Sequence, residues 1–168
     1  MGDISVIHPA EAASSDTAYG AVVRGVLIGG VLAGVVDIFA AVLINQAPPG
    51  LILRFIASGL VGKMAFQGAG PMMALGFGLQ LAMAVLIAAT YGAASLRLPA
   101  LTRHPVSLGA LFGVGVFIVM SFIVVPLSAA VHPKHPPSLA AIGQNLAAMV
   151  LFGLIVSLSQ AWASRAKA

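Results

Sequence analysis

Residues 24–45 have the sequence RGVLIGGVLAGVVDIFAAVLIN, in which Asp37 is the only charged side chain after the opening arginine. A helix needs about 20 predominantly apolar residues to cross the hydrocarbon core of a bilayer. The chain then breaks at Pro48-Pro49-Gly50, because proline cannot continue a helix and the residue before it avoids helical angles. This segment therefore predicts a transmembrane helix over residues 24–45.

The whole chain has the composition of a membrane protein. Of its 168 residues, 60% are hydrophobic and only 7% are charged, and the mean hydropathy is +1.08. A soluble domain carries about 25% charged residues, and so few polar groups could not cover the surface of a soluble fold. The length allows one domain. We therefore predict an all-α integral membrane protein and exclude a soluble domain, a disordered chain and a coiled coil.

Three further segments are long and apolar enough to span, and they cover residues 71–95, 106–126 and 139–162. Residues 49–64 carry Arg54 and Lys63 and are too short and too charged to cross. We therefore expect a four-transmembrane-helix bundle with a short interfacial or re-entrant helix after the first span.

The regions outside the spans complete the domain organisation. Residues 1–20 are polar and lack the basic segment of a signal peptide, so we expect them to form a flexible tail on the cytoplasmic side. Residues 21–164 form the membrane domain, and residues 165–168 form a basic cytoplasmic C-terminus. Ser138 is placed to cap the last span.

Basic residues near the helix ends predict the orientation. With four spans, one side of the membrane holds Arg24, Arg97, Arg103, Arg165 and Lys167, and the other holds Arg54, Lys63 and Lys134. Cytoplasmic loops carry the excess of Lys and Arg, so both termini are predicted to be cytoplasmic. The basic residues are scattered over these ends, which indicates contact with anionic lipid head groups and no nucleic-acid partner.

Small residues recur at a spacing of four on every predicted span. Lipid tails are as apolar as leucine, so helices in a bilayer associate where small residues allow their backbones to approach. The positions predicted to pack against neighbouring helices are Gly29, Ala33, Gly34, Gly76, Gly109, Gly113 and Gly143.

A few polar residues within the membrane domain are candidates for a binding site. Asp37 is the only carboxylate inside a predicted span, and such residues are costly and usually face the interior of a bundle. The helical rise puts Gln80, Ser121 and Asn145 at comparable depths in the same half of the membrane. We therefore predict a polar cluster of these four residues, with Arg54 as the charge partner of Asp37.

Three interpretations of Asp37 remain open. It could form a structural hydrogen bond or ion pair with Gln80 or Arg54, it could relay a proton or cation, or it could lie close enough to the surface to reach water.

The sequence contains no signature of an enzyme, a metal site or a cofactor site. It has no Cys, and it lacks the HExxH, P-loop, GxSxG and dinucleotide-binding motifs. His132 and His135 are three residues apart in a proline-rich loop where the direction of their side chains is undefined, so we predict no metal there.

Several short motifs resemble a family of small four-span bacterial inner-membrane proteins that has no assigned activity. The motifs are Ile56-Ala57-Ser58-Gly59-Leu60-Val61-Gly62 with Ala65-Phe66, then Tyr91, Leu98-Pro99, Arg103-His104-Pro105, Gly109, Gly113 and Val124-Val125-Pro126-Leu127-Ser128. The resemblance extends over residues 25–158. It implies the same four-span fold in a bacterial inner membrane.

Together these features favour a non-catalytic membrane protein. We expect an accessory or scaffold component that binds lipid or another membrane protein, or that forms a homo-oligomer. The alternative is a small transporter or channel that uses the cluster around Asp37, and a membrane-embedded enzyme is the third and weakest hypothesis.

Overall fold

The computed structural model describes residues 9–68, 70–130 and 138–166, and every regular element in these ranges is helical. The elements are α1 (Pro9–Asn45), α2 (Pro49–Val61), the 3₁₀ helix η1 (Gly62–Phe66), α3 (Gly70–Arg97), α4 (Ala100–Arg103), α5 (Pro105–Val119), the π-helical turn η2 (Met120–Val124), α6 (Val125–Leu127) and α7 (Leu139–Arg165).

Five helical stretches in the described ranges are long and apolar enough to cross a membrane. They are Tyr19–Asn45, Pro49–Phe66, Gly70–Arg97, Pro105–Leu127 and Leu139–Arg165. Four of them correspond to the predicted spans. The fifth, made of α2 and η1, covers the segment predicted to be interfacial or re-entrant, and by length and composition alone it also qualifies as a span.

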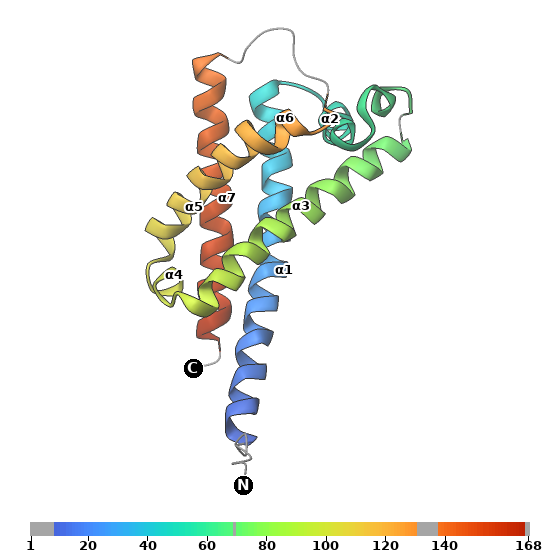
Figure 1. Cartoon of the computed structure of the whole chain (residues 1–168). Helices are drawn as coiled ribbons and strands as arrows, with labels where there is room; N and C mark the ends of the chain where they lie inside the picture. Colours follow the sequence, from blue (N-terminus) through green and yellow to red (C-terminus); the bar gives the residue numbers. More distant parts are fainter. Residues whose placement is uncertain (1–8, 69, 131–137, 167–168) are drawn as a thin grey trace.

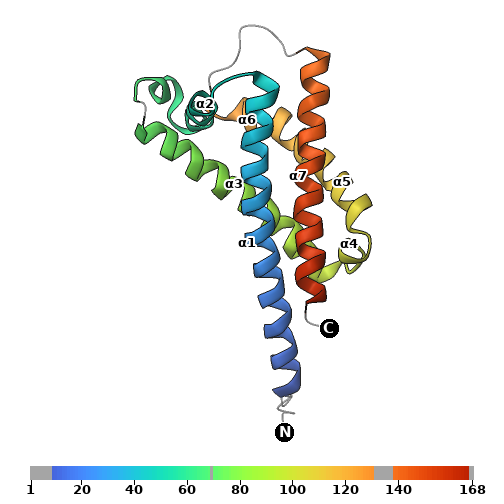
Figure 2. The ribbon, with the colours of Figure 1, turned by 180° about the vertical axis from the view of Figure 1, so that it is seen from behind.

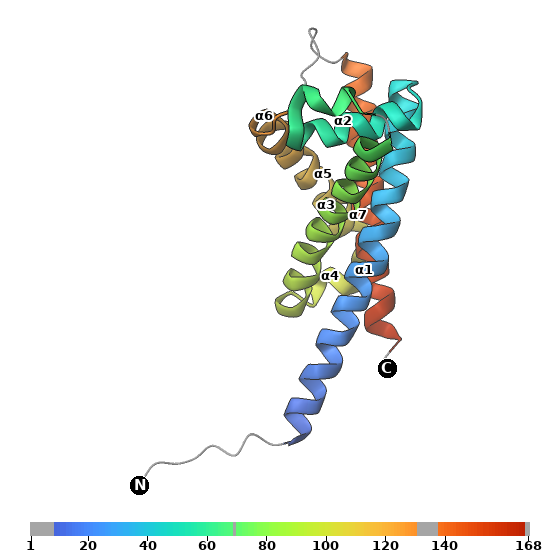
Figure 3. The ribbon, with the colours of Figure 1, turned by 90° about the vertical axis from the view of Figure 1, so that its right-hand side faces the viewer.

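The long helices pack in the order α3, α1, α7, α5. Helices α1 and α7 lie side by side and run in opposite directions, so that α1 begins and α7 ends at the same end of the molecule (Figures 1 and 2). Helix α3 crosses α1 obliquely, and α5 packs against the other side of α7 (Figure 1). Helix α2 packs on α3 and lies across the opposite end of the molecule, where α1 ends (Figure 3).

Two segments predicted to be irregular contain helix. The tail expected over residues 1–20 is helical from Pro9 onward. Alanine is the best helix former, and this alanine-rich segment continues the first span without a break. The loop expected between the second and third spans contains α4, which is one short helical turn.

The end of the third span is shaped by Pro126. The helix passes through this residue to Leu127, and a π-helical turn, η2, precedes it. Proline has no N–H, so the carbonyl of Phe122 cannot receive its usual bond from the residue four positions on. In the turn before the proline, the N–H of Val125 bonds to the carbonyl of Met120, five residues earlier, which is the wider π spacing.

The start of α7 has the cap that its sequence predicts. The Ser138 hydroxyl accepts a hydrogen bond of 3.1 Å from the backbone N–H of Ala141. This satisfies one of the unpaired donors at the helix start.

Glycines allow the spans to pack at backbone distance. A Cβ on Gly30 would lie 2.7 Å from the Cα of Val85, and one on Gly34 would lie 2.8 Å from the Cβ of Ala84, so both glycines face α3. The residues predicted for helix packing that do contact a neighbouring helix, or are buried, are Gly29, Ala33 and Gly34 on α1, Gly76 on α3, and Gly109 and Gly113 on α5.

The prediction for Gly143 needs correction. A Cβ there would meet nothing within 4 Å, and the residue is exposed. The helix contact of α7 lies farther along its length, where the backbone around Gly153 meets Gly109 and Gly113 of α5. A glycine early in α7 therefore has no steric role in this fold.

Candidate functional site

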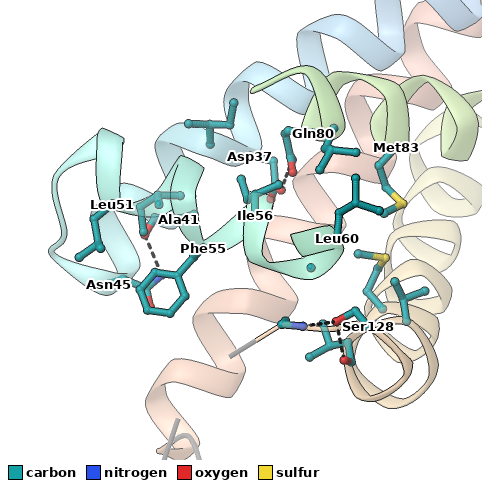
Figure 4. Close-up of a pocket in the computed structure, with 18 of the residues that line it drawn as sticks. Asp37, Ala41, Asn45, Leu51, Phe55, Ile56, Leu60, Gln80, Met83 and Ser128 are labelled. Atoms are coloured by element: carbon teal, nitrogen blue, oxygen red, sulfur yellow. Dashed lines mark hydrogen bonds between the residues drawn. The ribbon is translucent and has the colours of Figure 1, made fainter. Parts of the chain in front are cut away.

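An apolar pocket of about 770 Å³ lies among α1, α2, α3 and the segment η2–α6 (Figure 4). Its lining includes Ile38 of α1, Leu79 and Met83 of α3, and Met120 and Val124 of η2. Polar side chains contribute little to this wall, and they are Asp37, Asn45, Gln80 and Ser128. The site is thus a largely hydrophobic pocket with a few polar groups, which is the usual character of a small-molecule site.

Helix α2 covers the pocket with one of its faces. The lining residues on this helix are Leu51, Ile52, Phe55, Ile56, Gly59 and Leu60. Their spacing of one, three and four residues places them on one side of a helix. The opposite side packs on α3, where the Leu53 backbone meets Gly76. This periodicity is the sequence signal for a pocket wall, and it is independent of the charged residues and of the span lengths.

The pocket is bounded beyond α2 by the end of α6. The backbone N–H of Ala129 donates a hydrogen bond of 3.0 Å to the carbonyl of Gly59. This bond ties the chain after α6 to α2, and both Gly59 and Ser128 line the pocket at that junction. The π-helical turn supplies Met120 and Val124 to the same wall.

Asp37 and Gln80 are brought together at the pocket wall. The amide Nε2 of Gln80 donates a hydrogen bond of 2.7 Å to Oδ2 of Asp37 (Figure 4). Asp37 comes from α1 and Gln80 from α3, so the bond joins two neighbouring spans. Of the five residues predicted to form a polar cluster, these two alone meet.

Arg54 does not pair with Asp37, which corrects the predicted ion pair. Its Nε donates to the carbonyl of Ala65 at 3.1 Å, and its Nη2 donates to the carbonyl of Phe66. The guanidinium also lies over the Phe66 ring, 5.5 Å from the centroid. Arg54 thus caps the 3₁₀ helix η1, because it lies on the side of α2 away from the pocket-lining face.

Ser121 and Asn145 do not join the cluster either. Both are exposed, and neither lines the pocket. The Asn145 amide donates to the carbonyl of Ala141 on its own helix at 2.8 Å. These residues were grouped because they were expected to lie at comparable depths. Depth does not fix direction, however, because successive side chains along a helix point about 100° apart around its axis. Adjacent positions can therefore face different directions, and here Met120 lines the pocket whereas Ser121 does not.

The remaining polar candidates give no second site in the part of the chain that is described. His132, Lys134 and His135 fall outside the described residues. Among the residues that are described, no group of three or more His, Cys, Asp or Glu side chains could hold a metal ion.

Comparison of the chain with protein-family models, with curated proteins and with solved structures gives no match.

Proposed function

We propose that this chain is a non-catalytic accessory protein of a bacterial inner membrane that binds a lipid-like amphiphile from the bilayer in the pocket under α2. The observation that supports this proposal is the pocket itself: about 770 Å³, mostly apolar, and placed among helices that are apolar enough to span. The apolar wall of this pocket is poorly solvated by water. At membrane depth, the molecules available to fill it are lipid-like.

The size and wall of the pocket suit one small amphiphile. Pockets for single organic ligands commonly measure about 300–1,000 Å³. Met83 and Met120 lie in the wall, and the unbranched methionine side chain adapts to ligands of varied shape. A polar pair, Asp37 and Gln80, offers one fixed place for a polar head group. We therefore favour a lipid-like ligand over docking of a second protein helix.

A transporter remains the alternative, and it has less support. A transport pathway was expected to use a cluster of polar residues from four spans. Ser121 and Asn145 are exposed outside the pocket, so only Asp37 and Gln80 could contribute to such a path. The pair suits a bound head group better than a polar route across the membrane.

We further propose four spans, α1, α3, α5–α6 and α7, with α2–η1 not crossing. Helix α2 has 13 residues, which is about 20 Å of helix and short of the roughly 30 Å hydrocarbon core. It lies across the end of the molecule (Figure 3), and Pro49–Phe66 has the lowest hydropathy of the five candidate helices, 1.3. The start of α1 and the end of α7 then lie on one side, which the basic residues identify as cytoplasmic.

This topology predicts the accessibility of single cysteines. The natural chain has no Cys, so Lys63→Cys, Leu98→Cys and Ala166→Cys each introduce one reactive group at an exposed position. In intact cells, a membrane-impermeant maleimide should label Lys63→Cys, and it should label the other two only after permeabilisation. Labelling of Leu98→Cys in intact cells would contradict the arrangement, because a crossing α2–η1 moves that loop to the outside.

A substitution that places a larger side chain in the pocket tests whether a ligand binds there. Gly59 lines the pocket, and a Cβ there has only ordinary contact, 4.0 Å from Ser128. Gly59→Leu should therefore occupy ligand space without breaking a helix contact. We expect photolabelling of pocket residues by an alkyl diazirine in lipid nanodiscs to fall about tenfold, which corresponds to about 1.4 kcal/mol of lost binding.

Gly143→Leu is the matched control, because it adds the same side chain in open space on α7. It should leave the labelling of the pocket unchanged. The proposed binding function would be overturned if the natural protein and Gly59→Leu were labelled equally in the pocket. It would also be overturned if the labels were spread evenly over the lipid-facing helices.

A further inference from the structure

We propose that the ligand of this pocket is an amphiphile of net positive charge, an alkylammonium without a phosphate, whose head group pairs with the Asp37 carboxylate. The inference rests on the proposed binding function and adds the chemistry of the head group. It is carried by the charge of the lining residues and by the geometry of the Asp37–Gln80 pair.

Within the described residues, the pocket wall has a single ionisable side chain. Asp37 is the only Asp or Glu among the described lining residues, and these include no Lys, Arg or His. The nearest cation along α2, Arg54, is held by the carbonyls of Ala65 and Phe66. A carboxylate in apolar surroundings is costly unless it is paired or hydrogen-bonded, so a cationic group that enters this pocket gives Asp37 a counter-charge that no described lining residue supplies.

The hydrogen bonding of Asp37 leaves room for that partner. Gln80 donates to Oδ2, and within the described residues it is the only group that bonds this carboxylate. An ionised carboxylate has about four acceptor positions. The Gln80 bond therefore orients the group and leaves acceptor positions for an N–H donor or a compact ammonium in the pocket, which Asp37 also lines.

The same charges disfavour a phospholipid head group. A phosphate next to the ammonium would bring a negative charge beside Asp37, and no basic side chain among the described lining residues compensates for it. Like charges close together in apolar surroundings repel strongly. The head group that fits is thus a bare ammonium, and its chain would lie against Ile38, Ile56 and Met83.

The test uses photoreactive probes that share one alkyl chain and diazirine and differ only in the head group: primary ammonium, hydroxyl or phosphate. The full-length protein is labelled in phosphatidylcholine nanodiscs, and the labelled residues are mapped by peptide mass spectrometry. We expect the ammonium probe to label the pocket at least about tenfold more than the other two. Asp37→Asn should remove this preference, because Asn can still accept the Gln80 bond but carries no charge.

Two further variants separate loss of charge from loss of fold. Asp37→Glu keeps the carboxylate and should retain the preference for the ammonium probe. Ser121→Ala changes an exposed residue outside the pocket and should behave as the natural protein.

Equal labelling of the pocket by all three probes, unchanged in Asp37→Asn, would overturn the head-group assignment and leave the proposed binding function standing. Stronger labelling of the pocket by the phosphate probe would likewise overturn the head-group assignment and leave the proposed binding function standing. Labelling that avoids the pocket with every probe would overturn both proposals.

Discussion

Replacing Gly113 by alanine should destabilise the protein more than any other single-methyl substitution on α5. A Cβ at this position would lie 2.7 Å from the Cα of Val150 and would also collide with the carbonyl oxygen of Met149. These are backbone atoms of α7, so no rotamer change can relieve the collision, and the two helices must separate. Overpacking of this kind costs about 1–3 kcal/mol and occasionally more.

The expected result is a fall in the midpoint of thermal unfolding in detergent of roughly 2–12 °C, because the cost is about 1–3 kcal/mol and each kcal/mol corresponds to about 2–4 °C for a chain of this size. Gly115→Ala is the matched control. It lies two residues away on the same helix, and its Cβ would meet nothing within 4 Å. The control should be neutral or slightly stabilising, because alanine is the better helix former. Similar melting of both variants would refute the α5–α7 contact.

Gly76→Ala should loosen α2, the helix that covers the pocket. A Cβ on Gly76 would lie 2.7 Å from the carbonyl carbon of Leu53, with the carbonyl oxygen closer still. Because Leu53 is in the middle of α2, the whole helix must move away from α3. The substitution therefore acts on the pocket wall without changing any residue that lines it.

Amide hydrogen exchange over residues 49–66 is the direct measurement. If the collision costs about 3 kcal/mol, local opening of α2 becomes more frequent and exchange there should accelerate about a hundredfold. Gly78→Ala is the control, because its Cβ would face open space. Unchanged exchange in α2, or equal acceleration in the control, would show that the close approach of α2 and α3 is not a stabilising contact.

The long apolar helices were predictable because their signals are local. The start of α2 at Pro49 follows from the two prolines, and the Ser138 cap follows from a serine before an apolar run. The boundary at the N-terminus was not predictable in the same way. Polar residues near a chain end are compatible with a loose tail or with a helix, and α1 extends to Pro9 because nothing in the alanine-rich segment stops it.

The candidate site was predictable only in part. Asp37 stood out because a carboxylate in a span is rare, and Gln80 was a correct partner. Ser121 and Asn145 were grouped with them by depth, which the helical rise supplies, and Arg54 was added as a charge partner for Asp37. Whether two residues at one depth meet depends on how each helix is rotated about its axis. That rotation follows from packing against neighbours, and it turned all three away from the pocket.

The amino-acid sequence by itself determined that the chain forms long apolar helices typical of a membrane protein, where the prolines between them fall, and that Asp37 is the one carboxylate within the segments predicted to span. These properties depend on composition and on the order of neighbouring residues. The tertiary structure alone decided that α2 lies over a pocket, that Arg54 caps η1, and that Asp37 bonds Gln80 across two spans. Those contacts join residues far apart in the chain, and they depend on how closely the glycine faces let the helices approach.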